Sequence, residues 1–109
     1  MKETVESVSQ WAEETFGACT PEAALKRAIE EMDELVEWRR WALRAARHNS
    51  IELVEEAADV CITLYRYIYL VDPDAIEKKM AVNRARVWKM DGDGTGQHVK
   101  EYDERETSP

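Results

Sequence analysis

The sequence predicts an all-α protein in the form of a small four-helix bundle. Glycine and proline are scarce before residue 91, where they occur only as Gly17, Pro21 and Pro73. Apolar residues recur at spacings of three and four along four segments, which is the period of an amphipathic helix. β-branched residues never alternate with polar ones for long, so no strand is expected.

The first helix is expected over residues 3–16 and should end at Gly17, which suits the left-handed cap after a helix. The second helix should run from Pro21 to about residue 47, because Thr20 can cap it and proline is favoured at the first helical position. The predicted apolar stripes are Val5, Val8, Ala12 and Phe16 in the first helix and Leu25, Ala28, Ile29, Met32, Leu35 and Val36 in the second.

Ser50 is expected to cap a third helix over residues 51–71. Apolar side chains cover an arc of roughly 200° around this helix, against about 100° for an ordinary surface helix. It should therefore be buried on more than one side, and so thin a bundle favours a homo-oligomer. Pro73 should separate it from a fourth helix over residues 75–90.

The composition changes after Met90. Residues 91–109 contain three glycines and almost no apolar residues, which is typical of a loop and tail without a core. The sequence therefore predicts one all-α domain over residues 1–90, followed by a Gly-rich loop and mobile polar tail over residues 91–109.

The charge balance excludes several classes of partner. Against 23 Asp and Glu stand only 15 Lys and Arg, a net charge of −8. This argues against a nucleic-acid polymer or an anionic membrane as the main partner. No apolar run is long enough to span a bilayer or to form a secretory signal. Cys19 and Cys61 cannot build a disulfide framework, so a cytoplasmic location is expected.

Two pairs of acidic residues stand out. Glu31 and Glu34 lie three residues apart on the second predicted helix, and so do Glu56 and Asp59 on the third. Each pair shares one helix face, so neighbouring helices would bring four carboxylates together. Such carboxylates repel one another unless cations neutralise them, and oxygen ligands suit Mg²⁺ or Mn²⁺. The alternative is a solvated acidic surface; a di-iron site is disfavoured because Glu-x-x-His is missing.

The same acids carry a family resemblance. Glu30-Glu31-x-x-Glu34 followed by Glu56-x-x-Asp59 resembles the EExxE…ExxD signature of the MazG-like all-α nucleoside triphosphate pyrophosphohydrolases. Three further segments agree in order with this superfamily. They are Trp11–Gly17, which is similar to the W…TFG opening of the phage-type dATP/dGTP pyrophosphohydrolase branch, the Lys79, Asn83, Arg86 and Trp88 pattern, and the Gly-rich stretch Gly92–Val99.

The resemblance implies a MazG-like bundle that hydrolyses nucleoside triphosphates, with purine deoxynucleotides (dGTP or dATP) as the expected substrates, to monophosphate and pyrophosphate. It implies two or more Mg²⁺ ions per site, with Mn²⁺ as a possible substitute. It also implies a homodimer or homotetramer, in the host cytoplasm if the protein is phage-encoded. The implied metal ligands are Glu31, Glu34, Glu56 and Asp59, with Glu30 and Glu55 as candidates for a further metal or for orienting water.

Substrate contacts are expected from two further groups of residues. Lys79, Asn83 and Arg86 share one face of the fourth predicted helix and suit phosphate and sugar or base contacts. Trp11 can stack on a purine base, and Trp38 can form part of the wall of the nucleotide pocket. The alternatives are a solvated basic face and tryptophans used for packing. For the whole protein, the alternative function is a non-enzymatic acidic helical module that binds a basic protein partner.

Overall fold

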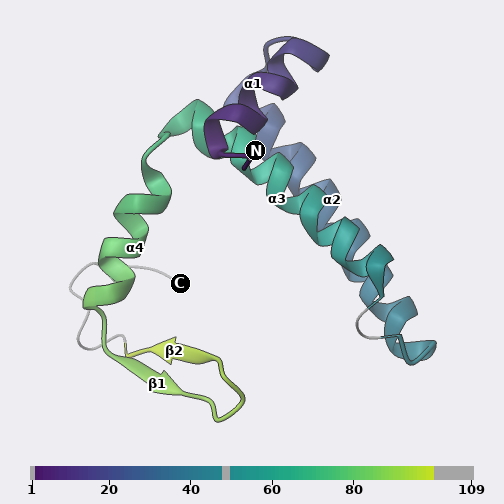
Figure 1. Ribbon diagram of the computed structural model, residues 1–109, viewed down its shortest axis with the longest axis vertical. Helices are drawn as coiled ribbons and strands as arrows, with labels where there is room; N and C mark the ends of the chain where they lie inside the picture. Colours follow the sequence, from purple (N-terminus) through teal and green to yellow (C-terminus); the bar gives the residue numbers. More distant parts are fainter. Residues whose placement is uncertain (1, 48–49, 100–109) are drawn as a thin grey trace. The chain divides into compact units, whose positions relative to one another are not determined.

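The computed structural model describes residues 2–47 and 50–99, and it is mostly helical (Figure 1). Four helices are followed by a small two-stranded hairpin, so the all-α prediction is confirmed except near the C-terminus. By contacts the chain divides into two compact units, Met1–Pro73 and Asp74–Pro109. Within the described residues no helix is both long and apolar enough to cross a membrane.

The first unit consists of α1 (Val5–Phe16), α2 (Pro21–Arg44) and α3 (Ile51–Val71). Helices α2 and α3 lie side by side along most of their length, and α1 packs against α3 (Figure 1). The predicted starts of α2 and α3 are confirmed by their caps. The side-chain oxygens of Thr20 and Ser50 accept hydrogen bonds from the backbone N–H groups of Ala23 and Leu53, at 3.2 and 3.3 Å.

Helix α2 has a narrow buried strip. The residues along it are spaced alternately four and three apart, which is the repeat of two helices packed lengthwise. They are Ala24, Ala28, Glu31, Leu35, Trp38 and Ala42, all buried or half-buried. We call this strip the α2 seam. Three of its members are alanines with almost no exposed surface, so the backbones of α2 and α3 can approach closely there.

The predicted apolar stripe of α2 is wrong on one side. Ile29, Met32 and Val36 are exposed, although they continue the three-and-four spacing. A lengthwise contact with a single neighbour covers only a strip, so apolar residues at its flank stay uncovered within one chain.

The core of the first unit is thin. Its buried apolar residues are all small, namely Val8, Ala12, Ala24, Ala28, Ala42 and Val60. No large side chain among the described residues is fully buried. A core of this size is marginal for an isolated chain.

The second unit contains α4 (Ala75–Ala85), β1 (Trp88–Met90) and β2 (Gly96–His98). The helix expected to reach Met90 ends five residues earlier, and an antiparallel hairpin pairs Trp88 with His98. The turn is closed by a hydrogen bond from the Asp91 N–H to the Thr95 carbonyl, at 2.9 Å. The expectation of no strand is therefore wrong here. The predicted tail beyond Val99 lies outside the described residues.

Local chemistry explains the change from helix to hairpin. Gly92 and Gly94 have φ values of 92° and 91°, which only glycine adopts without strain. The Trp88 indole N–H donates to the Asn83 carbonyl at 2.8 Å, which ties the first strand to the end of α4. The predicted boundary at residue 90, between an all-α domain and a Gly-rich loop and tail, stays a prediction.

Candidate metal centre

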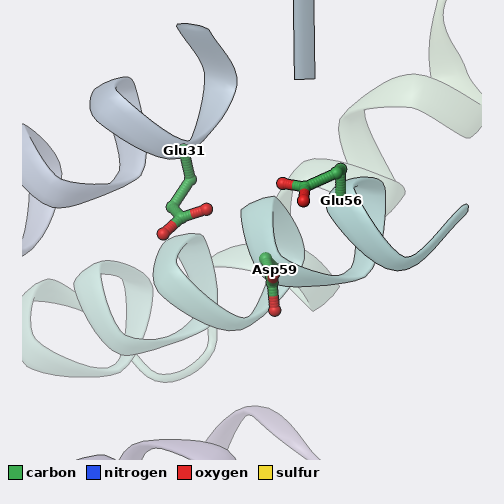
Figure 2. Close-up of side chains that lie close together, drawn as sticks. All are labelled: Glu31, Glu56 and Asp59. Carbon is green, nitrogen blue, oxygen red and sulfur yellow. The ribbon is translucent and has the colours of Figure 1, made fainter. Parts of the chain in front are cut away.

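Three carboxylates from two helices come together in the first unit. Glu31 approaches from α2, and Glu56 and Asp59 from α3 (Figure 2). One oxygen of each lies within 4.8 Å of the others. This is the only such group of metal-ligating side chains among residues 2–47 and 50–99. The prediction that acids of the two helices converge is confirmed for these three residues.

Glu31 occupies a position where packing alone would select an apolar residue. It belongs to the α2 seam and is only 6% exposed. A buried carboxylate in a helix seam is costly unless a proton or a cation compensates its charge. Its burial is therefore evidence for a role other than packing.

Glu56 supports the same interpretation. Its Oε2 atom is buried and has no hydrogen-bond partner among the described residues. A buried carboxylate oxygen normally has a partner. A hard divalent cation, which takes carboxylate oxygens as ligands, would satisfy it together with Glu31 and Asp59. The residues present thus fit an Mg²⁺ or Mn²⁺ ion.

Burial and charged neighbours both act on the buried carboxylate of Glu31. Burial raises the pKa of Glu31 above its ordinary value of 4.5. The Arg27 guanidinium counteracts this shift, whereas the nearby carboxylates of Glu34 and Asp59 raise the pKa of Glu31 further. Glu34 therefore lies within electrostatic reach of the cluster, although its oxygens are not part of the group of three.

A cavity of about 410 Å³ adjoins these carboxylates. Glu31 and Asp59 contribute to its wall, together with Arg27 and Arg66. The rest of the wall is mainly apolar and consists of Trp11, Ala12, Phe16, Cys19, Ala23, Ala24, Ile62 and Thr63. A cavity with an apolar part and a charged end suits a ligand that has an apolar part and a charged group.

The aromatic side of the cavity comes from α1. Trp11 and Phe16 make an edge-to-face contact with ring centroids 5.6 Å apart. Phe16 was expected to pack in the core, but it is 69% exposed and lines the cavity. Arg66 of α3 donates a hydrogen bond to the Gly17 carbonyl at the end of α1. This contact helps to hold the aromatic wall against α3.

The other predicted site residues lie outside the group of three carboxylates. Glu30 is exposed and pairs with Arg27 at 3.5 Å, and Glu55 is exposed outside the group of three. Trp38 does not line the cavity; it packs edge-on against Trp41, with ring centroids 5.4 Å apart. Lys79, Asn83 and Arg86 belong to the second unit, so the geometry of the first unit does not test their predicted substrate contacts.

Sequence reasoning missed Arg27. Its guanidinium forms an ion pair with Glu31, one turn further along α2, and it also faces Glu30. The signal was present in the sequence, because residues four apart are neighbours on a helix.

The comparisons with known proteins do not assign the chain to a family. No family model matches it, and no curated protein or solved structure gives a significant match. The resemblance to the MazG-like pyrophosphohydrolases therefore stays a prediction drawn from the motifs.

The raised pKa of Glu31 gives a testable pH dependence. A group with a higher pKa in the folded state stabilises the fold at low pH, and this contribution is lost as pH rises through the folded-state pKa. In EDTA, the melting temperature of the wild type should therefore fall relative to that of Glu31→Gln as pH increases from about 4.5 upward. Thermal melts of both proteins across this range provide the measurement. A constant difference between the two would contradict it.

Proposed function

We propose that this protein is a divalent-metal-dependent hydrolase of nucleoside triphosphates, with Mg²⁺ as the natural ion and Mn²⁺ as a substitute. The observation that carries the proposal is the group formed by Glu31, Glu56 and Asp59, of which Glu31 and Asp59 line the cavity. The acidic motifs add the expected reaction, in which water attacks the α-phosphorus, the bond from that phosphorus to the oxygen bridging to the β-phosphate breaks, and pyrophosphate leaves with this oxygen. Purine deoxynucleotides are the proposed substrates on the motif resemblance.

The chemistry divides between the carboxylates and the cavity. Bound divalent ions, two or more per site in our proposal, would neutralise the triphosphate and supply Lewis acidity at the phosphoryl group. Glu31, Glu56 and Asp59 would hold an ion, and the exposed Glu34 beside them can accept the proton of the attacking water. Glu30 and Glu55 remain candidates for a further metal.

The apolar wall suits the base. Trp11 and Phe16 offer aromatic surface next to the carboxylates, and a flat base can stack on such rings. On the motif resemblance, Lys79, Asn83 and Arg86 would bind the phosphates and sugar. A net charge of −8 means that a triphosphate would be repelled unless the metal enters first or with it.

Product analysis tests the proposed function. The protein should be incubated with each dNTP and NTP in Mg²⁺, in Mn²⁺ and in EDTA. We expect monophosphate and pyrophosphate in equal amounts with either metal, and no product in EDTA. Diphosphate with inorganic phosphate would contradict the reaction proposed. No turnover of any nucleotide would instead favour the acidic interaction module.

We further propose that the chain works as a homo-oligomer. Apolar side chains that a single chain leaves exposed gather on α2 and at the start of α3, namely Ile29, Met32, Val36, Leu43, Ile51 and Val54. Several of them border a hollow of about 500 Å³ between the two helices, which also includes Leu35 and Leu53. Apolar surface of this kind on a chain with a thin core is typical of an oligomer interface.

Charge substitution in this hollow should therefore change the assembly. Leu43→Glu and Val54→Glu should convert the oligomer into monomers, because each would bury a carboxylate in the proposed interface. Light scattering coupled to size-exclusion chromatography measures the mass. Met90→Glu is the control, since Met90 is also an exposed apolar residue but lies on the hairpin. A wild type of monomeric mass would contradict the proposed assembly.

A further inference from the structure

The ion pair on α2 lies at the metal centre itself. Arg27 has a side chain that is 54% exposed, yet its guanidinium reaches the buried carboxylate of Glu31. Its other terminal nitrogen lies 3.5 Å from Glu30. Arg27 also lines the cavity. It is thus the basic side chain that the structure places directly on a carboxylate of the group of three.

This contact has a simple electrostatic cause. Glu31, Glu56 and Asp59 bring three acidic groups within 4.8 Å, and no other cation is paired with them among the described ion pairs. In the ion-free protein Arg27 offsets part of this repulsion. A guanidinium hydrogen-bonded to a poorly solvated carboxylate makes a stronger pair than one in open solvent.

A divalent ion in the same place would change the balance. The oxygen of Glu31 that accepts from Arg27 belongs to a carboxylate that a metal would share. Two positive groups on one small carboxylate repel each other, and the ion carries the larger charge. The Arg27 side chain is half exposed, so it can turn into solvent or toward the cavity at little cost.

We infer that Arg27 is a built-in counter-ion, which occupies Glu31 in the metal-free protein and releases it when a divalent cation binds. This inference rests on the metal site of the proposed function. Arg27 is a positioning residue in this scheme. It holds the Glu31 carboxylate in place before the metal arrives, and it weakens metal binding by the free energy needed to break the pair.

The sign of the effect separates this role from a structural one. If Arg27 only supported α2, its removal would weaken metal binding or leave it unchanged. If Arg27 competes with the metal, its removal should tighten metal binding even while it destabilises the metal-free protein. The two readouts then move in opposite directions, which local damage does not produce.

Titration of Mn²⁺ alone, followed by calorimetry and by the EPR signal of free Mn²⁺, provides the test. Arg27→Met and Arg27→Gln should each lower the Kd for Mn²⁺ about fivefold, the upper end of the range for an ion pair with one exposed partner. Both should also melt at a lower temperature than the wild type in EDTA. Arg27→Lys keeps the charge and should keep a Kd close to that of the wild type.

Arg66→Met is the matched control. Arg66 lines the same cavity, but its hydrogen bond goes to the Gly17 carbonyl and not to a carboxylate. Its Kd for Mn²⁺ should stay within about twofold of the wild-type value. A second measurement uses arginine side-chain NMR during a titration with diamagnetic Mg²⁺, in which the Arg27 guanidinium signals should shift and those of Arg66 should not.

The outcomes distinguish this inference from the proposed function. Unchanged or weaker Mn²⁺ binding by both neutral variants overturns the inference, while nucleotide hydrolysis can still stand. Tighter binding in a protein that hydrolyses no nucleotide supports the inference and removes the proposed function. A wild type and variants that bind no Mn²⁺ overturn the counter-ion role together with the metal centre.

Discussion

Replacing Asp59 by Asn, or Glu56 by Gln, should reduce nucleotide turnover by at least about a hundredfold, a typical cost of removing one group that stabilises charge in a transition state. Each change preserves side-chain shape but removes a charged ligand from the group of three. The remaining two carboxylates hold a divalent ion more weakly, and the chemistry depends on that ion. Initial rates of pyrophosphate release, at an Mg²⁺ concentration that just saturates the wild type, provide the measurement.

The fold should survive both changes. Asp59 is exposed, and Glu56 Oε2 has no hydrogen-bond partner to lose. Circular dichroism spectra should match that of the wild type. Glu37→Gln is the control, because Glu37 lies on α2 in an exposed ion pair with Arg40 and outside the cluster. Full activity in both ligand variants would remove these residues from the metal centre.

Replacing Ala28 by Phe should destabilise the first unit by about 1–3 kcal/mol or more, the range found for overpacked cores. Ala28 is 2% exposed in the α2 seam and lies three residues before Glu31. A large ring there must push α2 away from α3, because small residues leave it no space. Total stabilities are about 5–15 kcal/mol, so this is a large fraction. Urea unfolding followed by circular dichroism gives the free energy of unfolding.

The same variant should lose metal affinity. Glu31 stands on α2, whereas Glu56 and Asp59 stand on α3, so a wider separation between the helices parts the three oxygens. Ala58→Phe is the control, since Ala58 is exposed on α3 one residue from Asp59. An Ala28→Phe protein with wild-type stability and Mn²⁺ affinity would show that the seam is more tolerant than its burial indicates.

Much of the first unit follows from local chemistry. Thr20, Pro21 and Ser50 mark helix starts because capping is decided within one turn of the chain. The acids on α2 and α3 were predicted to meet if the two helices are neighbours, because the spacing within each pair places both acids on one helix face. The side of each helix that becomes buried depends on the neighbour, and therefore Ile29 and Val36 were wrongly expected in the stripe that packs.

The hairpin was harder to predict for a different reason. Its strands have three residues each, too short for alternation to be visible in the sequence. The pairing of Trp88 with His98 depends on the turn between them, where Gly92 and Gly94 take positive φ values. The glycines predict a loop, although they also suit a tight turn between strands.

The alanines of the α2 seam have a consequence for the precision of the metal centre. Alanine has no side-chain torsion angle, so it has only one shape and loses no rotamer entropy when it is buried. A seam of leucines could repack through alternative rotamers and let two helices slide or separate by small steps. Ala24, Ala28 and Ala42 offer no such freedom. The distance between the carboxylates is thereby set by backbone contact, and the adjustment to an ion's radius must come from the torsions of the glutamates and the aspartate alone.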